Sequence, residues 1–459
     1  MAQGPRLDIH TLRHVLRTRL GADVHVDAEP PSAATGVAFH TGRVRPGDAF
    51  FALPGERVHG FAFADEALAR GAAFVVSDRP HPRGVVVDDP AAALLALGHE
   101  ARSAWRGPIV GVSGSMGKTT MKALLAAALD ARSSEGNRNT PFALAGTLVE
   151  GWLEQDTERP LVLELGIDHA GEMDRLTTLV RPTHALLTTI DAAHLDGLGD
   201  LAGVTREKSR LLEAATMARY AGAGAWDRLE RDLGARTLRY ALDGADVPTG
   251  RYVAEDGGGV LEARPGPGDD VLRVPLPGLG RALAEHALGA LVLARDVGVP
   301  LPLAARRIAS ARLEGRRLQA HRIGRLTLLD DSYNANLASM RLALDVLRAL
   351  PGPHAAVLGD MRELGTEAER HHALLAEACA DVATLWTVGP QSAVLGAGSA
   401  LARHYPDVAA ALTDVADLPR TGTLLVKASR SIGLDRLVDA LLAREDAETG
   451  PGDAAGDAR

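Results

Sequence analysis

A glycine-rich segment at residues 111–120 has the residue types of a phosphate-binding loop. It reads Gly-Val-Ser-Gly-Ser-Met-Gly-Lys-Thr-Thr, after an apolar run and before a helical pattern, and that is the context such a loop requires. In such loops, backbone N–H groups bind phosphate oxygens, a lysine reaches the β- and γ-phosphates, and a threonine hydroxyl ligates Mg²⁺. The strict spacing would place a glycine where Val112 stands, and an ordinary glycine-rich turn is the alternative. We predict nucleotide binding through Gly114, Ser115, Met116, Gly117, Lys118, Thr119 and Thr120.

Two polar side chains further along the chain could serve a metal ion. Glu164 lies in the apolar run 161–165, where a carboxylate is costly unless it has a partner. The carboxyl ends of parallel strands face the ligand crevice, so Glu164 is a candidate Mg²⁺ ligand, with a structural ion pair as the alternative. His194 follows the next apolar run, 185–190, and could bind a metal or a phosphate. An ordinary hydrogen-bonded histidine explains His194 equally well.

Lysine is rare in this chain. Only Lys118, Lys122, Lys208 and Lys427 occur among the 50 lysine and arginine residues, and arginine-biased codon usage explains most of that imbalance. Lys118 has a chemical reason to persist, because the planar fork of arginine is too wide for its slot in a phosphate loop. Lys208 lies on a helix predicted to start near Asp200, and by itself it would be taken as an exposed charge. No chemical reason of this kind applies to Lys122.

The overall composition is that of a globular protein with several domains. The chain has 459 residues, 46% of them apolar and 24% charged, which suits about three domains of ordinary size. Its net charge of −9 argues against a general nucleic-acid binder. The single cysteine, Cys379, fits a reducing compartment, and neither a signal peptide nor an apolar run of about 18 residues is present. We expect a cytoplasmic protein without a membrane span.

Three segments of different pattern must position these residues. Residues 1–106 mix short strands and helices, whereas 107–313 alternate apolar strands with helices, as in a parallel sheet covered on both faces. A second, smaller alternating unit spans 314–445, and 446–459 is predicted to be a flexible tail. The predicted fold is α/β with three domains. The expected strands are 49–53, 72–76, 84–87, 108–112, 161–165, 185–190, 326–329, 355–358, 384–388 and 423–426, the expected helices are 63–70, 91–105, 118–131, 339–350, 367–382 and 435–442, and an irregular hairpin is expected within 243–270.

In this order, the motifs resemble those of the Mur ligases, the ATP-dependent amide-forming enzymes of bacterial cell-wall synthesis. The resemblance covers nearly the whole chain, apart from the tail and residues 243–270. In the first half it rests on RPGDAFFALPGER (45–57), GSMGKTT (114–120), GNRN (136–139), LELG (163–166), AHLDGLGD (193–200) and REKS (206–209). The most diagnostic segments are DDSYNAN (330–336), LGDMRELG (358–365) and LVKASRS (425–431).

The resemblance implies a domain plan, a reaction and cofactors. A small N-terminal domain would bind the UDP substrate, a central phosphate-loop domain would bind ATP, and a Rossmann-like C-terminal domain would complete the ligase. The match is best to the branch that joins D-alanyl-D-alanine to the C-terminal carboxylate of UDP-N-acetylmuramoyl-tripeptide through an acyl phosphate, with release of ADP and phosphate. ATP and a pair of Mg²⁺ ions would take part, and Lys208 would be carbamylated, a modification that arginine does not form under these conditions. We expect a monomer.

The family's pattern also implies roles at matching positions. Its metal-binding positions match Thr119, Glu164, His194 and the carbamylated Lys208. Its catalytic positions match Lys118, Lys208, His194 and Glu164. The arginine that reaches the ATP phosphates matches Arg316, and the aspartate that contacts the ribose matches Asp331. Asn334 and Asn336 lie in the segment that matches the nucleotide-side loop. Positions on the substrate side match Arg43, Asn137, Asn139, Lys427, Ser429 and Arg430.

Some segments depart from that pattern. At 41–43 this chain has Thr-Gly-Arg where the family usually has Asp-Ser-Arg, and at 140–145 it lacks the Asn and the Ile-Gly-x-Pro that usually follow GNRN. At 188–190 it has Thr-Thr-Ile in place of Thr-Asn-Ile, and at 280–283 it has Gly-Arg-Ala-Leu in place of Gly-Arg-His-Asn. These changes lie at substrate and nucleotide edges, so they bear on substrate detail more than on reaction type. One alternative is a folylpolyglutamate-type or tripeptide-forming ligase, which the DDSYNAN and LGDMRELG segments disfavour. Another is a non-catalytic ATP-binding relative, which retention of Lys118, Glu164, His194 and Lys208 disfavours.

Overall fold

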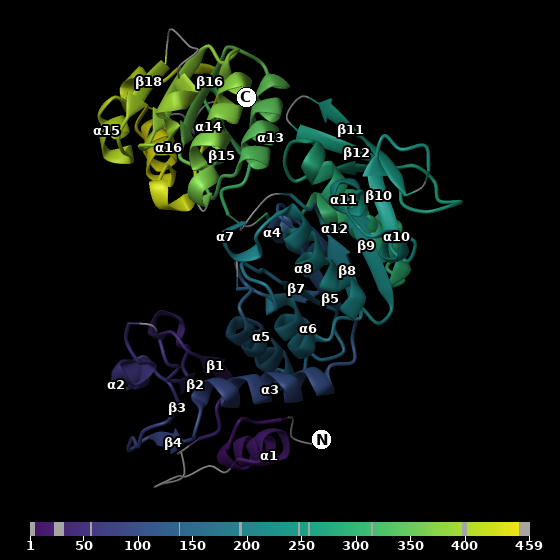
Figure 1. Cartoon of the computed structure of the whole chain (residues 1–459), viewed down its shortest axis with the longest axis vertical. Coiled ribbons are helices and arrows are strands. Elements are labelled where there is room, and N and C mark those ends of the chain that lie inside the picture. The colour runs from purple at the N-terminus through teal and green to yellow at the C-terminus, as the bar shows by residue number, and fades with distance from the viewer. Residues whose placement is uncertain are drawn as a thin grey trace, which may run out of the picture.

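Three sheets, each with its own helices, follow one another along the chain. The computed structural model describes residues 5–22, 32–55, 57–136, 138–191, 195–246, 248–255, 258–313, 315–362, 364–396 and 402–448. In Figure 1 the sheets form an N-terminal lobe at the bottom, a central lobe and a C-terminal lobe at the upper left. The predicted α/β fold with three units is confirmed, and the boundaries at residues 106 and 313 stay a prediction.

The N-terminal lobe contains a four-stranded parallel sheet in the order β1-β2-β3-β4. Its strands are almost wholly buried, as expected where helices cover a parallel sheet. The strands are β1 (Gly36–Ala38), β2 (Asp48–Phe51), β3 (Phe74–Ser77) and β4 (Gly84–Val86). The helices are α1 (Ile9–Leu20), α2 (Ala64–Ala69) and α3 (Pro90–Ala104), with 3-10 turns at Thr41–Arg43 and Gly60–Phe63.

The central lobe contains a nine-stranded sheet in the order β13-β12-β11-β10-β9-β8-β5-β7-β6. Strands β5 to β11 pair in parallel, and β12 and β13 add an antiparallel edge. The β11–β12 pair is the hairpin expected within 243–270. The strands are β5 (Ile109–Ser113), β6 (Arg132–Ser133), β7 (Leu161–Glu164), β8 (His184–Leu187), β9 (Ala218–Gly222), β10 (Leu238–Leu242), β11 (Thr249–Glu255), β12 (Gly258–Arg264) and β13 (Leu272–Pro275).

Helices cover both faces of the central sheet. Helix α4 packs with α11 and α12 on one face, while α5, α6 and α8 share a hydrophobic cluster with α3 and the N-terminal lobe on the other. Figure 1 shows α3 lying between α1 and the pair α5 and α6. The helices are α4 (Lys118–Leu129), α5 (Pro141–Leu153), α6 (Glu172–Val180), α7 (Leu195–Leu198), α8 (Leu201–Ala214), α9 (Ala223–Trp226), α10 (Arg231–Gly234), α11 (Arg281–Asp296) and α12 (Leu301–Ala309).

The C-terminal lobe contains a six-stranded sheet in the order β14-β15-β19-β16-β17-β18. All pairs are parallel except β14 with β15. The strands are β14 (Gln319–Ile323), β15 (Arg325–Asp331), β16 (His354–Gly359), β17 (Thr384–Val388), β18 (Ala402–Tyr405) and β19 (Thr421–Lys427). The helices are α13 (Leu337–Arg348), α14 (Ala368–Ala376), α15 (Val408–Thr413) and α16 (Asp435–Glu448), with 3-10 turns at Gly365–Glu367, Glu377–Cys379, Ser392–Gly396, Val415–Asp417 and Arg430–Ile432.

Two predicted elements differ from those observed. The single helix expected over 367–382 is α14 with a 3-10 turn at each end. Helix α16 continues through Glu448, so the first residues of the predicted tail are helical, and 449–459 lie outside the described residues. Within the described ranges, no helix is long and apolar enough to cross a membrane.

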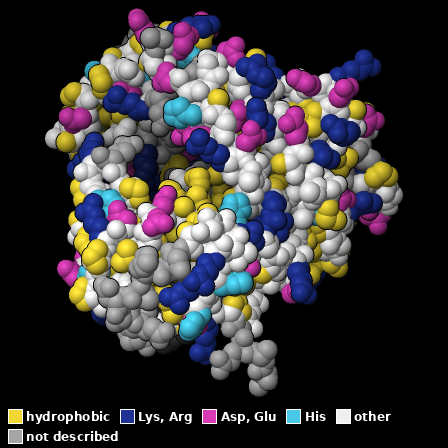
Figure 2. All heavy atoms as spheres, turned by 60° about the horizontal axis from the view of Figure 1, so that its bottom comes forward, with side chains coloured by type: hydrophobic (Ala, Val, Ile, Leu, Met, Phe, Trp, Pro, Cys, Tyr) yellow, Lys and Arg dark blue, Asp and Glu magenta, His cyan; other side chains and the backbone are white. Residues whose placement is uncertain are grey.

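The motifs lie at the carboxyl ends of strands in the central and C-terminal sheets. The phosphate loop follows β5 in the central sheet, and the DDSYNAN, LGDMRELG and LVKASRS segments begin in the last residues of β15, β16 and β19. In Figure 1, α7 and the start of α4 lie on the side of the central lobe nearest the C-terminal lobe. Figure 2 shows this molecule hollowed on one face, with hydrophobic side chains inside the hollow and charged side chains around its rim.

Candidate functional site

The phosphate loop connects β5 to α4, as predicted, and the structure explains why two of its positions are glycine. Gly114 has φ +148° and Gly117 has φ +75°, values that only glycine adopts readily. A Cβ atom at Gly114 would overlap the Thr188 hydroxyl, and one at Gly117 would overlap the His286 imidazole. Burial lowers the pKa of His286 to about 4. The imidazole beside the loop is therefore neutral at pH 7.

Residues after β8 hold the phosphate loop in place. Ser115 N donates to Thr189 O at 2.8 Å, and Met116 N donates to the Thr189 hydroxyl at 3.3 Å. The Thr188 hydroxyl donates to Met116 O, and the Ser115 hydroxyl exchanges two 2.9 Å hydrogen bonds with the Asp191 backbone. In the sequence, residue 189 stood out only as a departure from the family pattern. Its contacts show that Thr189 holds the phosphate loop in place through hydrogen bonds.

Two lysine ammonium groups converge on one carbonyl of this loop. Lys118 Nζ donates to Gly114 O at 2.9 Å, and Lys208 Nζ donates to the same oxygen at 3.2 Å from α8. Lys208 is 0% exposed, and burial together with the neighbouring Lys118 lowers its pKa to about 7. Burial also lowers the pKa of Lys118. Like charges held this close in a buried place repel each other, so the arrangement favours anions beside both lysines.

Glu164 lies beside the same loop and is 2% exposed. Its carboxylate accepts hydrogen bonds from the Thr119 hydroxyl at 2.8 Å and from Asn139 Nδ2 at 3.3 Å. Both donors are neutral, so they compensate the buried negative charge only in part. The structure thus brings together three of the predicted residues, although Asn139 was predicted on the substrate side.

This donor set fits a magnesium ion. A hydroxyl and a carboxylate are hard oxygen ligands, and Mg²⁺ takes one or two such protein ligands and fills its remaining positions with phosphate oxygens and water. Among the described residues, no group of three or more His, Cys, Asp or Glu side chains is placed to hold a metal ion. The predicted ligand His194 lies outside the described residues, as does Asn137.

Lys122 is a site residue for which the sequence suggested no chemistry. It is 1% exposed, and its ammonium donates to Ser134 O at 2.6 Å and to Gly136 O at 2.5 Å. These carbonyls begin the loop that leads to Asn139 and so to Glu164. Lys122 therefore anchors the loop beside the metal position. The sequence signal for Lys122 was that it is one of only four lysines in the chain.

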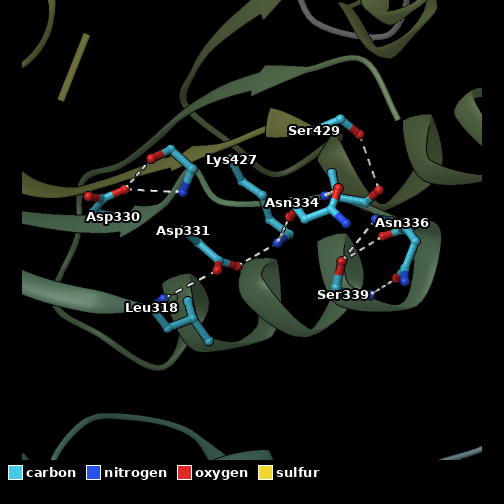
Figure 3. Close-up of polar contacts among 10 residues, drawn as sticks. Leu318, Asp330, Asp331, Asn334, Asn336, Ser339, Lys427 and Ser429 are labelled. Atoms are coloured by element: carbon cyan, nitrogen blue, oxygen red, sulfur yellow. Dashed lines mark hydrogen bonds and ion pairs between the residues drawn. The ribbon is translucent and has the colours of Figure 1, made fainter. Parts of the chain in front are cut away.

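A second polar cluster lies at the carboxyl ends of β15 and β19 (Figure 3). Lys427 Nζ contacts Asp331 Oδ2 at 2.7 Å and Asn334 O at 2.8 Å, and Leu318 N donates to Asp331 Oδ1 at 3.3 Å. Both charged side chains are nearly buried. Burial raises the pKa of Asp331, and the Lys427 ammonium opposes that effect. The pair holds the DDSYNAN loop against the end of β19.

Three further predicted residues have local partners in this lobe. Asn336 caps α13 in a reciprocal pair with Ser339 (Figure 3), and Ser339 N donates to its side chain at 2.8 Å. The Ser429 hydroxyl accepts from Arg362 N at 2.9 Å. Arg316 contacts Asp330 at 3.2 Å and Asp439 at 2.5 Å. These contacts occupy the Arg316 guanidinium within the C-terminal lobe, and its predicted contact with ATP stays a prediction.

A cavity of about 350 Å³ lies where the N-terminal lobe meets the central lobe. The predicted substrate residue Arg43 lines it together with Arg45 and Arg138. Arg45 also pairs with Glu135 at 3.1 Å, and both of these side chains are well exposed. The other lining residues are Val37, Ala38, Phe39, His40, Gly42, Val44, Asp48, Glu135 and Glu150.

Comparison with known proteins identifies the family. Family models match residues 35–99 (Mur ligase family, catalytic domain), 112–294 (Mur ligase middle domain) and 316–430 (Mur ligase, glutamate ligase domain). The chain is 34% identical over 442 residues to the UDP-N-acetylmuramoyl-tripeptide–D-alanyl-D-alanine ligase of Escherichia coli (strain K12), which covers 92% of this chain and 95% of the relative. The chain belongs to the Mur ligase family. The resemblance that the motifs suggested is confirmed.

Solved structures support the fold of this Mur ligase. A crystal structure of MurF from Acinetobacter baumannii has a TM-score of 0.83 at 24% identity and covers 96% of this chain and 100% of that one. MurF ligase from Thermotoga maritima, crystallised in complex with ADP, has a TM-score of 0.77 at 23% identity and covers 90% of this chain and 98% of that one. At these identities the likeness concerns the three-lobed fold.

Proposed function

We propose that this Mur ligase is an ATP-dependent amide ligase of peptidoglycan precursor synthesis. It joins D-alanyl-D-alanine to the C-terminal carboxylate of UDP-N-acetylmuramoyl-tripeptide and releases ADP and phosphate. The observation that carries the proposal is a formed phosphate loop, with Thr119 and Glu164 in contact beside it, in a chain 34% identical to a ligase of that name over nearly its whole length. Cytoplasmic location and a monomeric state stay predictions.

The first step brings two anions together. The tripeptide carboxylate attacks the γ-phosphorus of ATP, a bond forms between them, and ADP leaves with the electron pair of the broken bond. Lys118 supplies a positive charge at the amino end of α4, where the helix N-terminus also favours anions. Phosphoryl transfer depends mainly on positioning, and the contacts of Thr188 and Thr189 with the loop provide that rigidity.

Thr119 and Glu164 would hold one Mg²⁺ ion at the phosphates. When bound, such an ion offsets negative charge on the transferring group. Glu164 orients Asn139 as well as Thr119. Lys122 anchors the loop that carries Asn139 and that also brings Arg138 to the cavity lined by Arg43.

Lys208 is proposed to be carbamylated. In that reaction the neutral amine forms an N–C bond to carbon dioxide and releases a proton. The contacts of Lys208 support this, because its ammonium donates to Gly114 O and has a cationic neighbour in Lys118. A carbamate would replace that repulsion by attraction, and a pKa of about 7 leaves a neutral amine available near neutral pH. With His194 it would offer ligands to a second Mg²⁺ ion.

The second step needs the acyl phosphate kept from water. The amine of D-alanyl-D-alanine attacks the acyl carbon, and the tetrahedral intermediate collapses with release of phosphate. The C-terminal lobe carries the predicted amine-side residues Lys427, Ser429 and Arg430 on the edge where its motifs lie, and its closure over the central lobe would exclude water. The UDP end is proposed to bind in the cavity lined by Arg43, because arginine pairs suit diphosphate oxygens.

An omission experiment tests this function. Purified protein is incubated with Mg²⁺ and ATP, and ADP release is followed with UDP-tripeptide and D-alanyl-D-alanine present together or singly. We expect full turnover only with both substrates, and loss of turnover in the Lys118→Met variant. Turnover with glutamate or another amino acid in place of the dipeptide would indicate a related ligase. ATP binding without ADP release for any cell-wall peptide would indicate a non-catalytic relative.

A further inference from the structure

The residue before Lys208 is a buried carboxylate that faces a different part of the molecule. Glu207 on α8 is 5% exposed, and its Oε1 accepts a hydrogen bond from Met173 N of α6 at 2.9 Å. Lys208, one residue later, faces Gly114 O of the phosphate loop. Consecutive residues on a helix point about 100° apart, so α8 presents one side chain to α6 and the next to the phosphate loop.

The contact from Glu207 caps the amino end of α6. This helix begins at Glu172 after Gly171, which has no side chain with which to cap it. The first N–H groups of a helix have no partner within the helix, and the helix dipole favours a carboxylate beside them. The Glu172 carboxylate is turned to the preceding loop, where it accepts from Asp168 N and His169 N. Glu207 therefore supplies α6 with an acceptor from a distant part of the chain.

The capped end of α6 belongs to the segment that follows Glu164. This segment leaves β7 at Glu164 and reaches α6 at Glu172. Helix α7, which directly precedes α8, lies against the same segment, because a Cβ atom at Gly197 would overlap Asp168 O. Glu207 thus joins α8 to the segment that begins with the predicted magnesium ligand.

Apolar packing alone does not fix how far α8 is turned or shifted along its axis. Leu211 lies against β5, where a Cβ atom at Gly111 would overlap its side chain, but apolar contact is non-directional. Polar contacts with α6 depend on distance and angle. Besides Glu207, the half-exposed Arg210 contacts Asp174 of α6 and lies 3.4 Å from the Glu207 carboxylate. These directional contacts set where each residue of α8 lies.

We propose that Glu207 is a positioning residue that keeps the Lys208 side chain directed at the phosphate loop. The proposal rests on the ligase function proposed above, in which a carbamylated Lys208 serves the second Mg²⁺ ion. Without the contact to Met173 N, α8 is free to turn or slide against α6, and Lys208 Nζ then leaves Gly114 O. A displacement of about 1 Å at a group that takes part in the reaction costs on the order of a hundredfold in rate.

Steady-state kinetics and crystal structures of the full chain test this role. Glu207→Gln keeps an oxygen acceptor for Met173 N, whereas Glu207→Met keeps the size of the side chain without the acceptor. We expect Glu207→Met to lower kcat by about tenfold or more, with KM for D-alanyl-D-alanine within about twofold of wild type, and Glu207→Gln to recover most of that loss. In the crystal structures, Lys208 Nζ should lie apart from Gly114 O in the methionine variant and bonded to it in the glutamine variant.

A helix cap elsewhere in the chain provides the matched control. Asp8 caps α1, where its carboxylate accepts from Thr11 N at 2.8 Å, and α1 lies at the bottom of the N-terminal lobe, away from α8 (Figure 1). Asp8→Ala should lower the melting temperature, as Glu207→Met does, and leave kcat unchanged. Should Glu207→Met fail to fold, Glu207→Asp draws the acceptor back by one methylene and gives the same comparison.

Either of two results would overturn the positioning role. The first is a kcat of Glu207→Met within twofold of wild type despite a lower melting temperature, because the cap then serves stability alone. The second is a Lys208 side chain still bonded to Gly114 O in the crystal structure of that variant. A wild type that binds ATP and never releases ADP would refute the ligase function, and the crystal structures would still decide whether Glu207 positions Lys208.

Discussion

Conversion of the buried Lys208 amine into a carbamate changes how stability depends on pH. In carbon-dioxide-free buffer, the folded chain lowers the pKa of Lys208 from 10.5 to about 7. Between these values the unfolded chain holds a proton that the folded chain has released. The free energy of unfolding therefore rises with pH by about 1.4 kcal/mol per pH unit in that window, and the stability lost between its top and bottom is on the order of 5 kcal/mol. If a carbamate forms, bicarbonate extends this slope below pH 7, because the folded side chain then stays unprotonated while the unfolded one holds a proton.

The assay is denaturant unfolding between about pH 6 and 9.5, with and without bicarbonate, for the wild type and Lys208→Met. The methionine variant has no titrating amine, so it provides the baseline for other groups. In carbon-dioxide-free buffer we expect the stability of the wild type to rise more steeply with pH than that of Lys208→Met above about pH 7 only. In bicarbonate the same difference in slope should extend below pH 7, together with a carbon-13 carbamate signal from labelled bicarbonate. Lys208→Ala should regain some activity with acetate or propionate, and Lys208→Arg should not. Equal slopes, no labelled carbamate and bicarbonate-independent activity would refute the reasoning.

Three further substitutions probe separate contacts. Lys122→Met leaves two loop carbonyls without their donor, so we expect the free energy of unfolding to fall by about 1–3 kcal/mol. KM for the UDP-tripeptide should rise more than KM for ATP, and equal rises would argue against loop anchoring. Gly117→Ala places a Cβ on the His286 imidazole, at a positive φ that costs an alanine about 1–2 kcal/mol. ATP binding should therefore weaken severely, whereas unchanged binding would show that the loop relaxes freely. Asp331→Asn leaves the buried Lys427 ammonium without its counter-charge, so the free energy of unfolding should fall by about 3–5 kcal/mol. The double variant Asp331→Asn with Lys427→Met should recover part of that loss. A double variant whose loss equals the sum of the two single losses would contradict the pairing.

Local patterns in the sequence predicted the positions of the sheets. The apolar runs that became β5, β7 and β16 were visible because buried parallel strands carry few polar residues. The phosphate loop was visible because its chemistry depends on adjacent residues. The broken helix at 367–382 was not, because helical periodicity does not distinguish one α-helix from an α-helix with a 3-10 turn at each end.

Contacts between distant residues were not predictable from local pattern. Lys122 looks like any charge on a helix until the chain brings Ser134 and Gly136 under its ammonium. Residue Thr189 likewise gains its role only when β8 lies beside β5. The same limit applies to Arg316 and Arg317, which are adjacent in the chain. The sequence could not show that Arg316 is the one that contacts the carboxylates of Asp330 and Asp439.

The transfer of oxygen during turnover tests the acyl-phosphate route most directly. UDP-tripeptide labelled with oxygen-18 in its C-terminal carboxylate is ligated to D-alanyl-D-alanine with unlabelled ATP, and the released phosphate is analysed by mass spectrometry. An acyl phosphate carries one carboxylate oxygen to phosphorus, so each phosphate released should contain one labelled oxygen. Amide product formed with unlabelled phosphate would contradict the route, because the carboxylate would then not have been phosphorylated.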